Sequence, residues 1–277
     1  MPSSNELHFC PLFSGSSGNA LYIGYQNTHL LIDAGMSGAK ITAELNRIGL
    51  SPDLLCGILI THEHTDHIAG AGILSRKYDL PIFANERTWE AMRPKLGNIQ
   101  EKNIRIFETG IDFPIDSLSV TPFAIPHDAA EPVGYSICTQ NVKLGIATDL
   151  GTVKESWMKH LENSDLVLLE SNHDVDVLKA SRYPYDLKRR ILGTKGHLSN
   201  DTAGKAAVSL VQRGVRSIVL GHLSGDTNFP ELAYQSVCCM LQQTGIAPGT
   251  DVMLSVASRD GCNATYVLGG KCGMKTL

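Results

Sequence analysis

Short apolar runs separated by turn-forming residues recur along the whole chain and predict a mixture of strands and helices. The first three apolar runs, at 7–13, 20–25 and 29–32, are typical of an antiparallel meander. The segment 39–48 has apolar positions at helical spacing and ends before Gly49, a common residue at a helix C-terminus. The run 55–60 predicts the next strand, and 68–78 predicts a helix after it.

The rest of the chain alternates in the same way. Strand-like runs lie at 118–125, 133–139, 142–147, 165–169, 216–220 and 251–254, and helical patterns at 154–161, 201–212 and 230–245. No low-complexity linker, charge block or short repeat marks a boundary between domains. We therefore expect residues 1–277 to form a single α/β domain, with mixed sheets covered by helices.

Composition and charge restrict the classes of function. Hydrophobic residues make up 43% of the 277 positions and charged residues 19%, as in soluble globular proteins. The formal net charge of −4 does not favour a nucleic-acid-binding surface over the whole molecule, so a polyanion would need a local patch or bound metals.

Cellular location is also constrained. No apolar run approaches the roughly 20 residues of a membrane span, and the N-terminal residues lack a basic region followed by an apolar stretch. The seven cysteines form no CxxC pair, and their odd number argues against a closed disulfide framework. We therefore expect a cytoplasmic protein, without a membrane partner, whose thiols are reduced.

The densest cluster of potential metal ligands directly follows the strand predicted at 55–60. Within Thr61-His62-Glu63-His64-Thr65-Asp66-His67, three imidazoles and one carboxylate follow one another closely. Nitrogen and oxygen donors of this kind suit zinc, manganese or iron. A solvated loop that happens to be rich in histidine is the alternative, but the position at the end of a buried strand favours a metal site.

Three more donors occupy the same kind of position. His127, Asp149 and His222 each stand where an apolar strand gives way to a polar loop, which is where α/β folds build their sites. Each alone is compatible with a turn-forming or buried polar residue. Together with the cluster, they predict a catalytic metal centre.

The order His62-x-His64-x-Asp66-His67, then His127, Asp149 and His222, resembles the metallo-β-lactamase fold superfamily. Asp33, in Leu30-Leu31-Ile32-Asp33-Ala34-Gly35, matches the first motif of that superfamily, and the correspondence runs from about residue 7 to 268. The resemblance implies a four-layer αββα sandwich that carries two divalent ions, Zn or Mn. It assigns His62, His64 and His127 to the first ion, Asp66, His67 and His222 to the second, Asp149 to both, and to Asp33 the orientation of the metal loop.

Departures within the superfamily favour its nuclease and phosphodiesterase branch. Asp149 stands where the best-known β-lactamases have cysteine, and the loop 125–130 differs from the glyoxalase II-like pattern. The segments 14–20, 169–174, 196–200 and 221–224 most resemble the YycJ/WalJ-type exonucleases. The resemblance implies metal-dependent hydrolysis of DNA, from a 5′ end, with Asp149 as a catalytic residue and DNA as the partner.

A basic segment adds an independent indication of a polyanionic substrate. Between 174 and 199 the chain carries Lys188, Arg189, Arg190 and Lys195, which can contact phosphates, with Tyr183 and Tyr185 available for stacking. A solvated helical face is the alternative interpretation of such a Lys-Arg-Arg run.

Two further histidines are candidates for proton delivery. His173 and His197 are not among the expected ligands, and an imidazole near its ordinary pKa can protonate a leaving oxygen. Alternatively, His197 bonds a loop carbonyl and His173 supports a ligand. Ser199 precedes the helix expected near 201, where its hydroxyl and the helix N-terminus could bind a phosphate.

Two rival functions remain at this stage. A small-molecule or cyclic phosphodiesterase agrees with the negative net charge. A regulatory protein that keeps the fold without turnover is the second alternative, although its ligand set would be expected to have decayed.

Overall fold

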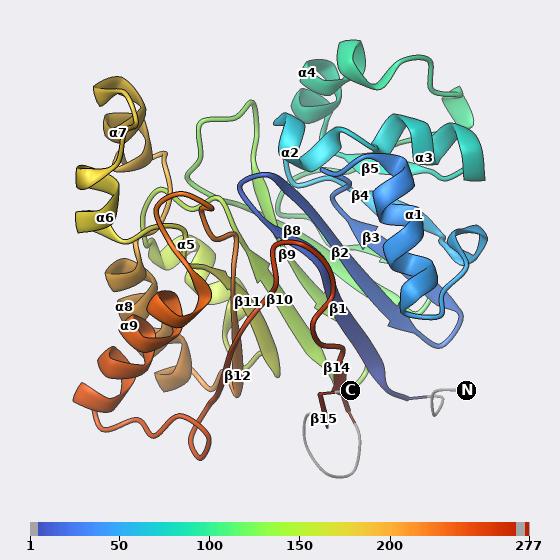
Figure 1. Cartoon of the computed structure of the whole chain (residues 1–277). Coiled ribbons are helices and arrows are strands. Elements are labelled where there is room, and N and C mark those ends of the chain that lie inside the picture. Colours follow the sequence, from blue (N-terminus) through green and yellow to red (C-terminus); the bar gives the residue numbers. More distant parts are fainter. Residues whose placement is uncertain (1–4, 270–274, 277) are drawn as a thin grey trace.

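Two β-sheets lie face to face, with helices on both outer sides, in the computed structural model (Figure 1). It describes residues 5–269 and 275–276. Residues 1–4 of the N-terminal segment discussed above, and Cys272, lie outside the described residues.

The first sheet has eight strands in the order β15-β14-β1-β2-β3-β4-β5-β6. The meander predicted at the N-terminus is confirmed, since β1 pairs with β2 and β2 with β3, both antiparallel. From β3 to β6 the strands are parallel. The strands are β1 (Leu7–Gly15), β2 (Gly18–Tyr25), β3 (Thr28–Ile32), β4 (Gly57–Leu59), β5 (Ile82–Ala84), β6 (Ile104–Ile106), β14 (Tyr266–Leu268) and β15 (Lys275–Thr276).

The second sheet has seven strands in the order β13-β12-β11-β10-β9-β8-β7. Its β7 to β10 half is antiparallel, and its β10 to β13 half is parallel. The strands are β7 (Phe113–Ile115), β8 (Leu118–Ala124), β9 (Val133–Cys138), β10 (Lys143–Ala147), β11 (Leu166–Glu170), β12 (Ser217–Gly221) and β13 (Met253–Val256).

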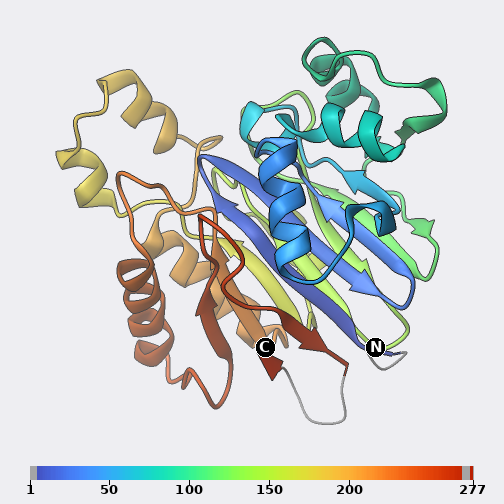
Figure 2. The ribbon, with the colours of Figure 1, turned by 45° about the vertical axis from the view of Figure 1, so that its right-hand side comes forward.

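The helices form the two outer layers and one projecting arm (Figures 1 and 2). Beside the first sheet lie α1 (Gly38–Arg47), α2 (Thr65–Ile68), α3 (Ala71–Tyr78) and α4 (Glu86–Leu96). Beside the second lie α5 (Glu155–Met158), α8 (Asn200–Gln212) and α9 (Pro230–Gln243). The helical arm, residues 175–191, comprises α6 (Val175–Ala180) and α7 (Tyr185–Ile191), and 3-10 turns lie at Pro52–Leu54, Glu101–Asn103 and Lys159–Leu161.

Three apolar layers hold this arrangement together. Neighbouring residues on one strand enter different layers: Leu30 packs between the sheets, whereas Leu31 packs under the helices of the first sheet. In the same way Leu168 faces the first sheet and Leu169 faces the helices on the other side. A strand that is buried on both faces has a continuous run of apolar residues in its sequence. The four-layer αββα sandwich expected from the resemblance is confirmed.

Two local expectations need correction. The single helix expected at 68–78 is divided into α2 and α3, because the backbone N–H of Gly70 donates to Ala34 O at 2.7 Å and docks the metal motif onto the end of β3. The expectation of reduced thiols is wrong for Cys10 and Cys262, which form a disulfide between β1 and the loop before β14. In the part of the chain that the structure describes, no helix is both long and apolar enough to cross a membrane.

Candidate metal centre and pocket

Three site residues lie within two residues of a strand end and share an unusual backbone conformation. Asp33, Asp149 and His222 come after β3, β10 and β12, with φ values of 60°, 60° and 55°. The left-handed region is uncommon for residues other than glycine. At each of these strand ends the chain turns sharply, and the three side chains are brought to one edge of the facing sheets.

The first group of donors consists of three imidazoles. His62 Nε2 lies 3.0 Å from His64 Nδ1, which in turn lies 3.3 Å from His127 Nε2. His62 and His64 belong to the loop after β4 in the first sheet, and His127 follows β8 in the second. The two sheets therefore supply one trio of nitrogens.

The second group contains one carboxylate and two imidazoles. Asp66 Oδ2 lies 3.5 Å from His67 Nε2 and 3.8 Å from His222 Nε2. The donor atoms of this trio, like those of the first, all lie within 4.8 Å of one another.

Asp149 lies between the two groups. Its Oδ1 is 3.7 Å from His127 Nε2 and 3.5 Å from His222 Nε2, and its Oδ2 is 3.4 Å from His67 Nε2. The carboxylate thus faces donors of both groups, as a residue shared by two ions must. All seven residues predicted as ligands are brought together.

In two of the histidines, Nδ1 donates a hydrogen bond that fixes the orientation of the ring and of its other nitrogen, Nε2. Asp33 Oδ2 accepts from His67 Nδ1 at 2.7 Å, and Asp33 Oδ1 accepts from the backbone N–H of Thr61 at 2.8 Å. Gly196 O accepts from His127 Nδ1 at 3.2 Å. Such bonds set the tautomer that leaves Nε2 free as a metal donor. Asp33 therefore holds the motif as expected, without facing the centre of the cluster.

Glu170, whose carboxylate is fully buried, is a site residue that sequence reasoning missed. Its Oε1 accepts from His197 Nδ1 at 2.8 Å and from His222 Nδ1 at 2.9 Å, and its Oε2 accepts from the backbone N–H groups of Leu150 and Leu198. Four donors occupy its two oxygens, so Glu170 orients the histidines. The only signal in the sequence was its place at the end of β11, the same position as the other site residues.

The charges of this cluster shift the pKa values of its members. Burial would lower the pKa of His222, but Asp149, Asp66 and Glu170 outweigh it and raise that pKa to about 10. The pKa of His67 likewise stays well above its ordinary value despite burial, because of Asp33 and Asp149. The pKa of His62 falls well below its ordinary value through burial and the neighbouring imidazoles.

The donor set fits divalent metal ions. Asp149 Oδ2 and His222 Nε2 are buried and have no hydrogen-bond partner, which is costly unless another group satisfies them. Four carboxylates (Asp33, Asp66, Asp149 and Glu170) meet at the cluster, and buried negative charge needs nearby positive charge. Nitrogen and carboxylate donors suit zinc and manganese.

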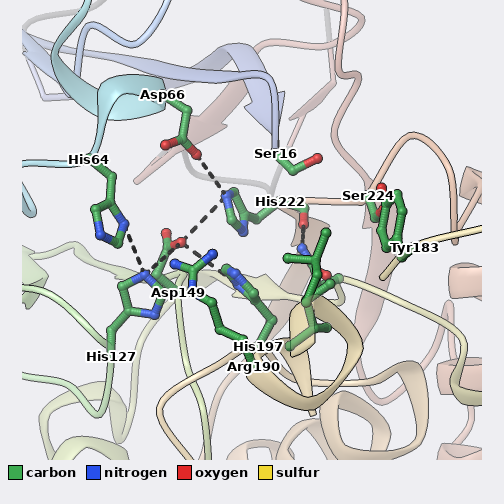
Figure 3. Close-up of a pocket in the computed structure, with 13 residues that line it drawn as sticks. Ser16, His64, Asp66, His127, Asp149, Tyr183, Arg190, His197, His222 and Ser224 are labelled. Carbon is green, nitrogen blue, oxygen red and sulfur yellow. Dashed lines mark hydrogen bonds and ion pairs between the residues drawn. The ribbon is translucent and has the colours of Figure 1, made fainter. Parts of the chain in front are cut away.

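An open pocket leads to this cluster. The cavity has a volume of about 270 Å³, and His64, Asp66, His127, Asp149 and His222 form part of its wall. Figure 3 shows Arg190 and His197 beside Asp149, and Ser16, Ser224 and Tyr183 on the side of His222 away from His64. The remaining lining residues are Asn172, Leu187 and Ile191.

Of the predicted phosphate-binding residues, Arg190 alone reaches the pocket wall. Its guanidinium donates to both oxygens of Asp128, at 2.5 and 3.0 Å. Lys188 Nζ instead donates to the carbonyls of Lys179 and Ser181, which fastens α7 to α6. Arg189 and Lys195 are exposed and do not line the cavity.

Of the residues proposed for proton delivery and for phosphate binding at a helix end, only some reach the pocket. His197 lines the pocket, and Glu170 holds its Nδ1. His173 is 1% exposed, is not part of the wall, and burial lowers its pKa to about 4. Ser199 caps α8 by accepting from the backbone N–H of Thr202 at 3.2 Å and lies outside the lining. Neither His173 nor Ser199 lines the pocket.

Comparison with known proteins agrees with this geometry. Residues 28–223 match the family model described as the Beta-lactamase superfamily domain. An "Exodeoxyribonuclease YycJ" of Bacillus anthracis is 43% identical, over 88% of this chain and 92% of that protein. An "Exodeoxyribonuclease WalJ" of Streptococcus pneumoniae serotype 2 (strain D39 / NCTC 7466) is 39% identical, over 90% and 93%.

A solved structure shows the same fold at low sequence identity. The metallo-beta-lactamase fold protein YhfI from Bacillus subtilis superposes with a TM-score of 0.72, over 95% of this chain and 99% of that one, at 15% identity. A likeness at this level of identity extends to the fold and not to the substrate.

Proposed function

The chain belongs to the metallo-β-lactamase superfamily and is a metal-dependent hydrolase, and we propose that it is a DNA exonuclease that acts from the 5′ end. The observation that carries this proposal is the convergence of seven nitrogen and oxygen donors at the wall of an open pocket that also presents Arg190. The curated relatives, similar over nearly their whole length, are named exodeoxyribonucleases.

We propose two metal sites. His62, His64 and His127 would hold one ion, and Asp66, His67 and His222 the other, with Asp149 shared between them. Zinc and manganese both suit these donors. Divalent ions bound here would supply acidification of water and neutralisation of charge on a phosphate.

The chain's own groups then have distinct tasks. Arg190, on α7, presents a guanidinium to the cavity, where it would bind the phosphate that is cut. His197 donates its Nδ1 proton to Glu170, so in the doubly protonated ring Nε2 carries the second proton, the one that would pass to the leaving oxygen. Asp149 keeps a pKa below its ordinary value, since His222, His67 and His127 outweigh its burial, and it remains an anion that can be shared.

The helical arm supports a polynucleotide as the substrate. Lys179, Arg182, Arg189 and Arg190 lie on or between its two helices, and Tyr185 is 76% exposed. Positive charge beside an exposed aromatic ring favours a nucleic-acid strand, since the basic side chains can contact phosphates and the ring can stack on a base. An enzyme of this kind acts where chromosomal DNA lies, and we place it in the cytoplasm.

We also propose that residues 1–277 act as one domain. The first sheet carries the loop with His62, His64, Asp66 and His67, and the second sheet carries the other three proposed ligands. Neither sheet alone contains a full set of donors for either ion.

The test uses end-labelled linear duplex DNA with a 5′-phosphate, incubated with enzyme reconstituted with manganese or zinc. We expect metal-dependent release of mononucleotides, loss of that activity in Asp149→Asn, and no change in the exposed control Asp112→Asn. Intact DNA together with hydrolysis of a small phosphodiester would select the small-molecule phosphodiesterase. Two bound metal equivalents without hydrolysis of any phosphodiester would select the regulatory protein.

A further inference from the structure

Arg259 lies beside the pocket, in the loop between β13 and β14, and has no role in the site described above. Its side chain runs over two glycines. A Cβ on Gly15 would come within 2.9 Å of Arg259 Cγ, and a Cβ on Gly225 would come within 2.3 Å of Nη1. These glycines adjoin Ser16 and Ser224, which line the pocket. The guanidinium therefore lies directly next to the pocket wall.

The positive charge of Arg259 is not neutralised by a protein carboxylate. Its Nε is buried without a hydrogen-bond partner. Within residues 5–269, no Asp or Glu oxygen lies within 4.0 Å of its guanidinium nitrogens, whereas Arg190, Arg213 and Arg216 each form such a pair. Partial burial of an unpaired guanidinium is costly, and an anionic ligand would offset this cost.

The surrounding groups favour an anion at this position. Ser224 Oγ accepts from the backbone N–H groups of Asp226 and Thr227, at 3.4 and 3.3 Å, and from the Thr227 hydroxyl at 2.9 Å. The same hydroxyl lies within hydrogen-bonding reach of Tyr183, so its own proton can be donated either to Tyr183 or to a bound anion. Tyr183 OH donates to Asp226 Oδ2 at 2.6 Å, so this carboxylate is paired with the tyrosine.

We propose that Arg259, together with Ser16 and Ser224, binds a second phosphate group of the substrate, one that is not cut. The inference rests on the proposed function and deepens it. Figure 3 places Ser16, Ser224 and Tyr183 away from the side of the pocket where His64 lies, so the two phosphates occupy different parts of one cavity. The planar fork of arginine suits two phosphate oxygens at once.

A second phosphate site selects the class of substrate. A polynucleotide offers phosphates at every residue, whereas a simple diester has only the phosphate that is cut. Binding at Arg259 therefore contributes to turnover of DNA and not to turnover of a small diester.

The experiment compares Arg259→Gln with the unmodified holoenzyme on three substrates: a 5′-phosphorylated oligodeoxynucleotide, its 5′-hydroxyl counterpart, and bis(p-nitrophenyl) phosphate. We expect kcat/KM for the phosphorylated oligonucleotide to fall by about tenfold to a hundredfold, as for loss of one charged hydrogen-bonding partner. The rate with bis(p-nitrophenyl) phosphate changes by less than about twofold, because that substrate does not reach Arg259. Arg216→Gln, an exposed arginine paired with Asp165, is the matched control and changes neither rate.

The two oligonucleotides distinguish the source of the phosphate. If the variant loses the preference for a 5′-phosphate, Arg259 binds the terminal phosphate. If it loses the same factor on both oligonucleotides, Arg259 binds an internal phosphodiester.

Gly225→Ala provides a second, independent variant. Its methyl group would lie only 2.3 Å from Nη1, so it displaces the guanidinium without removing it. The same selective loss on DNA is expected, with unchanged metal content and Tm. This variant keeps the test valid if Arg259→Gln folds poorly.

Equal losses on DNA and on bis(p-nitrophenyl) phosphate would overturn the inference, because Arg259 would then support the fold or the cut phosphate. Unchanged DNA hydrolysis in both variants would overturn it while leaving the exonuclease intact. Failure of the unmodified holoenzyme to degrade DNA would remove the proposed function and, with it, this inference.

Discussion

Glu170→Gln is the most informative single substitution at the metal centre. The change keeps the shape of the side chain but replaces two acceptor oxygens by one oxygen and one NH2 group. Glu170 is 0% exposed and accepts four hydrogen bonds, from two imidazoles and two backbone N–H groups. Glutamine therefore cannot satisfy all four donors.

Both orientations of the amide have a calculable cost. If its oxygen faces His197 and His222, the buried N–H groups of Leu150 and Leu198 lose their acceptor, at about 1–3 kcal/mol each. If its NH2 group faces the histidines, each Nδ1 must accept, and the proton moves to Nε2. His222 then presents N–H where a metal donor is needed. The first orientation lowers the free energy of unfolding, and the second lowers metal affinity.

The measurements separate these two results. Urea unfolding of the metal-free protein reports the first, with an expected loss of about 2–6 kcal/mol. Chelator competition reports the second, with an expected tenfold to hundredfold loss of affinity, roughly what removal of an outer-shell partner costs. Glu155→Gln, an exposed carboxylate paired with Arg213, is the control and should change stability by about 1 kcal/mol or less. If Glu170→Gln matched the unmodified protein in both measurements, the orienting role of Glu170 would be refuted.

Four further substitutions test other parts of the structure. Asp33→Asn keeps the left-handed backbone, which asparagine tolerates, but removes the charge that holds His67, and chelator competition should show about tenfold to hundredfold weaker metal binding. His173 has a pKa of about 4 in the folded state, below its unfolded value, so the free energy of unfolding should fall by roughly 3 kcal/mol as pH drops from 6.5 to 4, and His173→Gln should flatten that slope in urea titrations. Lys188→Met should loosen the helical arm by about 1 kcal/mol and speed its proteolysis, while the salt dependence of DNA binding stays the same. Arg190→Gln should instead reduce the salt slope of DNA binding by about one phosphate contact, and an unchanged slope would remove Arg190 from the interface.

The elements that the sequence predicted well share one property, a strong local pattern. The meander at the N-terminus, α1, α8 and α9 lie at the predicted positions to within one or two residues. The elements without a prediction include the short strands β5, β6, β7, β14 and β15, which have two or three residues each, the short helices α6 and α7, and α4, which contains Pro94. Strands of two or three residues depend on pairing partners far along the chain, and such pairing has no signature in a single sequence.

The metal donors were predictable because their residue types and their place after strands both pointed to one chemistry. The residues that face the substrate pocket could not be predicted in this way. In the Lys-Arg-Arg run, Arg190 faces the pocket while Lys188 bonds the arm's own carbonyls, and Arg189 is exposed. Helical position alone does not decide among these three, because the direction of a side chain depends on where the short helix docks. Arg259 was missed for the same reason, since only folding brings it to Gly15 and Gly225.

The backbone at the three strand ends shows why the donors converge as they do. Asp33, Asp149 and His222 hold positive φ values although none is glycine, at a cost of about 1 kcal/mol or more each. Glycine would relieve that cost but would remove the side chain. The strain is therefore retained where an extended strand must turn at once and still present a carboxylate or an imidazole to the other sheet. Replacement of any of the three by alanine would keep the strain and lose the interaction that offsets it, whereas asparagine at Asp33 or Asp149 would keep the conformation and isolate the effect of charge.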